Sequence, residues 1–286
     1  MDFVRKCFTV ILMRFFRFSA IILAIFLSVS LSACTDTPDG EHDPDTENTP
    51  EIELPEVPRS VSYDIESGSF SDLVVAEDGT VLLTVSADYP IISNPYELEN
   101  IDTLNELYAE NAQSYIDGTL EDLEQVVLDA YAEDADGFLP HSYEMTFEID
   151  FNKNGFLSIN RIFNEDGGDG LGVITEYYPH LIDMTTGTPL SYEALFSVPT
   201  EDIIQIIYLG FDSAAKSDPG RYYENYQDII NSERYNLQFC LTDRGVEFIM
   251  LPGVISKRQY GSRIFIVPFE DNEHLFNPIV LHGDGE

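Results

Sequence analysis

The chain has 286 residues, with 14 Lys or Arg against 52 Asp or Glu, which gives a formal net charge of −38 at pH 7. This balance excludes nucleic acid as a partner, because binding to phosphates requires a basic face. A cationic protein or a divalent cation suits such a field better, although the acids could equally serve only to keep an exported protein soluble.

The first 33 residues are typical of an export signal, with four basic residues before an apolar segment at 18–30 and small residues at the end. Leu31-Ser32-Ala33-Cys34 resembles the lipobox of bacterial lipoproteins, in which a peptidase cuts before the cysteine and its thiol carries diacylglycerol. The resemblance implies a lipid on Cys34 that holds the protein at the extracytoplasmic face of the membrane. The alternative is a signal anchor with an incidental cysteine.

Residues 34–60 form an acidic, proline-rich linker after that cysteine. It contains five prolines, and its nine acids between Asp36 and Glu56 are followed by the first base only at Arg59. Such a segment buries too little apolar surface to fold, and charge repulsion keeps it extended. The part of the chain after residue 33 carries 51 acids and 10 bases. Its remaining cysteine besides Cys34 is Cys240, so we expect no internal disulfide and a buried thiol.

Residues 61–160 are predicted to form an N-terminal half. Apolar runs at 73–76 and 80–86 flank a Glu-Asp-Gly turn and predict a hairpin. Apolar residues recur every three or four positions from Tyr96 to Asp117, which predicts a helix that Gly118 ends, and a second helix begins at Thr119. Strands at 143–151 and 156–163 follow, joined through Asn154-Gly155, with the alternating acids of the first strand facing water.

Residues 161–286 are predicted to form a C-terminal half. A strand at 171–183, a turn at 183–187, a helix from Thr200 that buries Leu209, and a helix at 222–230 precede three closing strands at 237–241, 246–250 and 264–267. The whole pattern predicts an α+β fold in which helices pack on antiparallel sheets, in a single compact body made of these two halves.

Two features of this half are candidate sites. Asp166 and Asp169 lie in the glycine-rich loop 164–170 and could form a weak cation loop, but the spacing lacks the ligands of an EF-hand, so we favour a solvated turn. Lys257, Arg258 and Arg263 form the densest basic cluster after the signal and could be an interaction patch, although pairing with surface acids is the simpler explanation. The sequence predicts no metal or cofactor site.

A family resemblance covers about residues 80–271. The stretch 182–196 resembles the signature D-x-x-T-G-k-x-l-x-l-x-d-l-F of an exported domain, and 236–248 resembles its later strand pair n-F-x-l-t-x-x-G-l-x-F. Gly261 with 264–268 resembles its closing strand, and 84–90 the entry of its N-terminal half. This domain is the outer part of RsiV-type anti-sigma factors, where it binds lysozyme, and it accompanies some peptidoglycan deacetylases. Gly167-Gly168-Asp169-Gly170 departs from the family's frequent Gly-Gly-Ala-His.

The resemblance implies a surface-anchored bacterial lipoprotein, RsiV-like in residues 161–286, that acts as a non-catalytic binding or sensing module in the cell envelope. Its partner would be a cationic envelope or host protein such as lysozyme, which the negative charge would attract. The short segment before the apolar run leaves no room for a sigma-binding region, so an anti-sigma factor is not expected.

Two alternatives stay open. The first is a cell-wall carbohydrate-active enzyme or its accessory domain, although no histidine pair of a metal-dependent deacetylase and no Gly-x-Ser-x-Gly elbow is present. A glycosidase needs only two carboxylates, so the acid-rich sequence does not exclude one. The second is an assembly lipoprotein that holds another exported protein.

Overall fold

A computed structural model describes residues 58–60, 62–170, 172–233 and 237–283, which belong to one unit from Pro55 to Glu286. The predicted signal, Cys34 and nearly all of the linker lie outside the described residues. The fold is the predicted mixture of helices and sheets, with one six-stranded and one three-stranded sheet. Among the helices of the described residues, none combines the length and the apolar composition that a membrane span requires.

The six-stranded sheet has its strands in chain order, so β1 forms one border. Neighbouring strands are antiparallel except β2 and β3, which run parallel. A parallel pair needs a long crossover connection, and helix α2 supplies it. The strands are β1 (Ile65–Val75), β2 (Val81–Ile92), β3 (His141–Lys153), β4 (Phe156–Asp166), β5 (Ile174–Asp183) and β6 (Thr188–Pro189). The predicted division at residue 160 falls inside β4.

Both predicted hairpins are confirmed. The turn between β3 and β4 consists of Asn154 and Gly155, whose φ angles are 57° and 76°. Two successive positive φ values define the turn that matches strand twist, and Asn-Gly reaches them at low cost. The 183–187 turn of the family signature is also built locally, because Asp183 Oδ1 accepts hydrogen bonds from the backbone N and Oγ1 of Thr185.

The prediction that Gly118 separates two helices is wrong. A single helix, α2 (Glu99–Glu133), runs through it for 35 residues, about 52 Å at 1.5 Å per residue. A glycine inside a helix costs about 1 kcal/mol relative to alanine. Tyr115, Ile116 and Thr119 are buried on the turns beside Gly118, and their packing against the sheet outweighs that cost.

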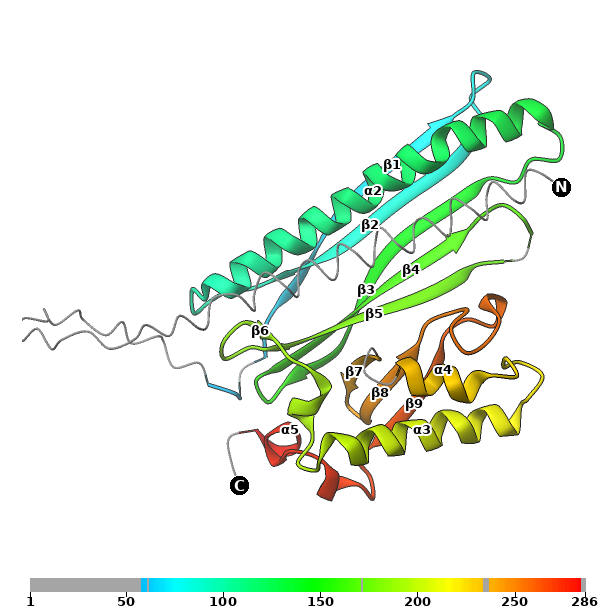
Figure 1. Cartoon of the computed structure of the whole chain (residues 1–286). Helices are drawn as coiled ribbons and strands as arrows, with labels where there is room; N and C mark the ends of the chain where they lie inside the picture. Colours follow the sequence, from blue (N-terminus) through cyan, green and yellow to red (C-terminus); the bar gives the residue numbers. More distant parts are fainter. Residues whose placement is uncertain (1–57, 61, 171, 234–236, 284–286) are drawn as a thin grey trace, which may run out of the picture. The chain divides into compact units, whose positions relative to one another are not determined.

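Helix α2 covers one face of the sheet, and Figure 1 shows it lying along β1 and β2. Its C-terminal part packs on β1, β2 and β3 in one apolar cluster, and its N-terminal part packs on β2, β4 and β5 in another. Tyr108 contributes to the second cluster and is only 2% exposed. The sequence periodicity therefore identified the buried face of α2 correctly even where it misplaced the break.

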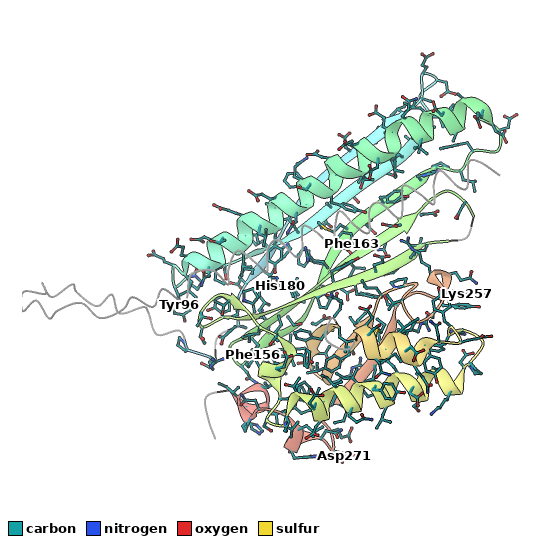
Figure 2. All side chains as sticks on the ribbon, in the orientation of Figure 1. Tyr96, Phe156, Phe163, His180, Lys257 and Asp271 are labelled. Carbon is teal, nitrogen blue, oxygen red and sulfur yellow. The ribbon has the colours of Figure 1, made fainter. Side chains whose placement is uncertain are left out.

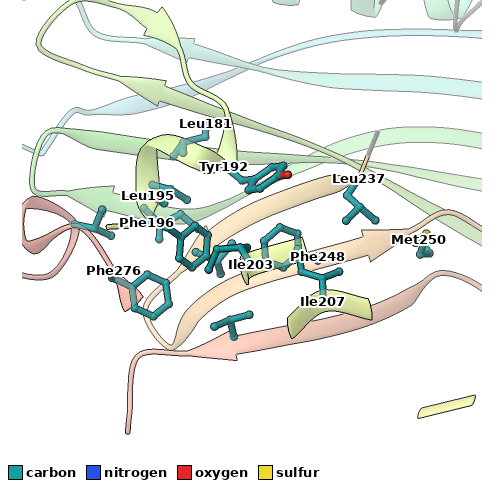
Figure 3. Close-up of a cluster of buried hydrophobic side chains, with 14 of the residues drawn as sticks. Leu181, Tyr192, Leu195, Phe196, Ile203, Ile207, Leu237, Phe248, Met250 and Phe276 are labelled. Carbon is teal, nitrogen blue, oxygen red and sulfur yellow. The ribbon is translucent and has the colours of Figure 1, made fainter. Parts of the chain in front are cut away.

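The C-terminal elements form the third apolar cluster together with Phe151, Phe156 and Leu181 of the large sheet (Figure 3). They are η1 (Tyr192–Leu195), α3 (Thr200–Ser217), α4 (Tyr226–Glu233), β7 (Gln238–Thr242), β8 (Gly245–Met250), η2 (Arg258–Tyr260), β9 (Arg263–Pro268), η3 (Glu273–Leu275) and α5 (Pro278–His282). The three closing strands agree with prediction. Leu209 does not, since it is 53% exposed while Phe211 is buried in its place.

One irregularity in β3 changes which residues face this cluster. The pairing of β3 with β4 shifts between Ile149 and Phe151, so Asp150 is an extra residue in the strand. Such a bulge reverses the alternation of side chains beyond it. Phe151 is therefore buried in the C-terminal cluster, on the face of the sheet opposite to Met145. Ile149, which the alternation placed on the buried face, is 37% exposed. Glu144 and Glu148 are exposed as predicted, but Asp150 is not.

Candidate functional site

Helix α2 carries a large excess of negative charge. The helix carries ten acids and no Lys or Arg. Nine of the ten are exposed and Asp122 is half-buried. Figure 2 shows oxygen-tipped side chains along the outer side of this helix. The acids are Glu99, Asp102, Glu106, Glu110, Asp117, Glu121, Asp122, Glu124, Asp129 and Glu133. We call this surface the acidic face of α2.

The acidic face of α2 is held at a cost in stability. Glu106 and Glu110, and likewise Asp117 and Glu121, are like charges four residues apart, which destabilise a helix by about 0.2–0.5 kcal/mol per pair. No basic residue lies in the last turn, where a cation would complement the helix dipole. Helix α2 therefore carries concentrated negative charge, although a mixture of positive and negative residues would make the helix more stable.

Two of the three residues of the predicted basic patch make hydrogen bonds within the fold. Arg258 donates from Nη2 to Glu165 Oε2 at 2.9 Å and to Glu176 Oε1 at 3.1 Å, which links η2 to strands β4 and β5. Arg263 is partly buried and donates from Nη2 to the carbonyl oxygen of Gly261 at 3.4 Å. Lys257 is exposed on the surface (Figure 2). Arg258 is therefore paired with acids as predicted, but Glu176 is buried and not on the surface.

The predicted cation loop begins at the end of β4. Asp166 Oδ1 accepts a hydrogen bond from Gly168 N at 3.0 Å, which closes a local turn. Asp166 and Asp169 act by charge on His141, whose pKa is nevertheless lowered because burial of the ring outweighs their attraction. No group of three or more His, Cys, Asp or Glu side chains within the described residues is arranged to hold a metal ion.

The sequence did not predict a polar pair that lies beneath α2. Tyr108 of α2 and His180 of β5 share a hydrogen bond of 2.6 Å between Oη and Nδ1. Burial, with a smaller contribution from nearby Arg161, lowers the pKa of His180 to about 3, so the ring is neutral at physiological pH. Burial also raises the pKa of Tyr108. A lone histidine in a strand pattern gives no sequence signal for this pairing, which depends on long-range packing.

A second buried polar group lies between Arg258 and β5. Glu176 is 6% exposed, and its carboxylate accepts hydrogen bonds from Arg258 and, at 2.9 Å, from Tyr178 Oη. Burial raises the pKa of Glu176, and Arg258 partly offsets that rise. The carboxylate is thus paired internally.

The bulge residue Asp150 forms a third polar site against β7. Burial raises its pKa to about 6, and the neighbouring thiol of Cys240 partly offsets that rise. Cys240 is buried, as the sequence predicted, and burial together with Asp150 and Glu247 raises the pKa of its thiol. A thiol with a raised pKa is a poor nucleophile, so this arrangement is suited to packing.

Comparison with known proteins gives structural matches alone. No family model and no curated protein matches the chain. The crystal structure of a member of the DUF3298 family from Bacteroides fragilis is similar with a TM-score of 0.53 and 15% identity, covering 80% of this chain and 100% of that one. A DUF3298 family protein from Pseudomonas aeruginosa has a TM-score of 0.47 at 13% identity, covering 77% and 97%. At such identity the Bacteroides match shows the fold alone.

Proposed function

We propose that this protein is a lipid-anchored, non-catalytic module of the bacterial cell envelope that binds a strongly cationic protein of the lysozyme type. In this proposal Cys34 carries the lipid at the extracytoplasmic face of the membrane, residues 34–60 are the spacer, and the folded body from residue 61 carries the binding surface.

The acidic face of α2 is the observation that carries the proposal. Ten acids without a base on one helix give a field of a single sign over about 52 Å. Such a field raises association rates with an oppositely charged protein and disfavours other partners. The like-charge pairs lower the stability of the helix, which is readily understood if the charge is retained for binding rather than for folding.

The perturbed titratable groups support a role without catalysis. Two of them are engaged in internal contacts, His180 with Tyr108 and Glu176 with Arg258. Each contact joins two elements of the fold, whereas a catalytic acid or base must reach a substrate. The similarity of the fold to DUF3298 proteins is compatible with an exported recognition domain.

A pull-down with immobilised lysozyme tests the partner. The full-length protein in detergent should be retained at about 50 mM NaCl and released at about 300 mM NaCl, because exposed charge attraction is screened within a Debye length. Absence of retention at both salt concentrations would rule out this class of partner. Release of reducing sugar or acetate from peptidoglycan fragments by the protein would instead indicate the enzyme alternative.

The anchoring half of the proposal has a separate test. Cys34→Ala should release the protein from membranes or leave it unprocessed, since two or more acyl chains are what hold such a protein firmly. Mass spectrometry of the native protein should show a diacylglyceryl-modified Cys34 at the N-terminus. Normal processing and unchanged membrane fractionation of Cys34→Ala would contradict lipid anchoring while leaving the binding test unaffected.

A further inference from the structure

Strand β1 is the border of the large sheet, and one side of its backbone has no strand partner among the described residues. The hydrogen bond from Ser93 N to the carbonyl oxygen of Asp64 fixes which residues bond to β2, namely the even-numbered positions. The odd-numbered residues therefore point their backbone groups outward. Consistently, Leu73 N bonds to the side chain of Asp72 at 2.8 Å instead of to β2.

This edge lacks most of the features that protect edge strands. Protection comes from Lys or Pro residues, from bulges and from short strands. β1 has 11 residues, contains neither Lys nor Pro, and shifts register only at its end between Val74 and Val75. The outward positions Ser67, Ser69 and Ser71 have small side chains, so an added strand can approach the backbone closely.

Helix α2 packs along β1 and β2 and carries exposed acids. Tyr131 donates from Oη to Asp78 Oδ2 at 2.7 Å, which places Tyr131 toward the turn between β1 and β2. Glu124, Asp117 and Glu110 precede Tyr131 at intervals of seven residues, and their stripe turns by about 20° per interval from the side of Tyr131 toward solvent. All three are exposed.

β1 adds negative charge on its helix-side face. Phe70 and Val74 pack into the cluster beneath α2, so the even-numbered side chains of β1 point to the helix side of the sheet. Glu66 and Asp72 share that parity and are exposed. A strand paired with β1 would therefore place every second side chain on the side of the sheet that carries these two acids and α2.

We infer that the open edge of β1 accepts an extended segment of the partner that alternates Lys or Arg with small or apolar residues. This inference rests on the proposed function and specifies how the cationic partner is held. Main-chain hydrogen bonds to the odd-numbered residues of β1 give affinity, and cation contacts on the helix side give specificity. Opposite charges directly across two strands contribute about 0.2–1 kcal/mol per pair.

A second copy of the chain is a poor occupant of the same edge. Antiparallel pairing of two β1 strands keeps the same faces of both sheets together, because the twofold axis is perpendicular to the sheet. The two α2 helices, each with ten acids and no base, would then lie on one side of the joined sheet and repel each other.

Binding of a synthetic peptide of about ten residues alternating Lys and Thr tests the inference. The full-length protein in detergent should bind it, and the variant Ser69→Pro should bind it at least tenfold more weakly. Proline is tolerated in an edge strand where its N–H would face solvent, so this change removes an outward donor while preserving the β1–β2 pairing. Unchanged circular dichroism and urea midpoint would confirm the intact fold. A peptide methylated at alternate backbone nitrogens gives the same test without a protein variant.

Three results would overturn the inference. The first is equal affinity for the ordinary and the N-methylated peptide together with no effect of Ser69→Pro, which would show attraction by charge alone and leave the proposed function standing. The second is no binding of the Lys–Thr peptide to a protein that does retain lysozyme. The third is a dimer in sedimentation that Ser69→Pro converts to a monomer, which would make a second copy the occupant. Loss of lysozyme binding itself would instead count against the proposed function.

Discussion

Substitution of Gly118 by alanine tests the continuous α2 helix most simply. A Cβ atom built at this position meets no atom within 4 Å apart from the adjacent helix backbone, so alanine adds no steric conflict. Alanine inside a helix is more favourable than glycine by about 0.5–1 kcal/mol. We therefore expect Gly118→Ala to increase the free energy of unfolding by that amount and to raise the melting temperature by about 2–4 °C per kcal/mol for a body of this size.

Gly210 of α3 provides the matched control. A Cβ atom there would overlap the ring of Phe265 on β9, so the helix-propensity gain is outweighed by overpacking that costs about 1–3 kcal/mol. Urea unfolding followed by circular dichroism should show a higher midpoint for Gly118→Ala and a lower one for Gly210→Ala, with unchanged slopes. A lower midpoint for Gly118→Ala would refute the continuous helix and restore the predicted break.

Three further predictions concern the buried polar groups. Arg258→Met should lower the free energy of unfolding by about 1.5–3 kcal/mol. The loss should be larger at pH 8 than at pH 4, because the carboxylates that lose their partner are charged at pH 8. Lys257→Met should have little effect in the same unfolding assay. The pKa of Asp150 rises from 3.8 to about 6 on folding, so its contribution falls as pH increases through this window, and Asp150→Asn should remove that fall and be more stable at pH 7. The pKa of His180 drops from 6.5 to about 3, so its contribution is lost as pH decreases through that range, and unfolding of His180→Gln should show a smaller loss of stability in acid.

Local signals in the sequence predicted most of the fold. Asn154-Gly155 specifies its turn through backbone conformations that few other pairs adopt, and strands flank it on both sides as predicted. The failures occur where packing overrides local preference. Gly118 continues a helix because its neighbours are buried, and Asp150 becomes a bulge because Phe151 has to face the C-terminal cluster. Neither the continuous helix at Gly118 nor the bulge at Asp150 can be predicted from the residues on either side.

The candidate site was predictable in part. The net charge and the number of acids in the sequence indicated a cationic partner. The structure was needed to show that ten of the acids lie on one uninterrupted helix. The basic cluster was identified from spacing, yet its partners Glu165 and Glu176 lie more than 80 positions away in the chain. The pairing of Tyr108 with His180 likewise needs the register of β5 under α2.

Calorimetric titration of lysozyme into matched charge variants tests the central claim most directly. One variant combines Glu110→Gln, Asp117→Asn and Glu124→Gln on α2, and the control combines Glu224→Gln, Asp228→Asn and Glu270→Gln on exposed positions elsewhere. Both lose three negative charges. At about 0.2–1 kcal/mol per exposed charge pair, the α2 variant should bind about tenfold more weakly than the unaltered protein, and the control less than twofold. Equal weakening by both variants would show that net charge alone attracts the partner and would contradict a binding surface on α2.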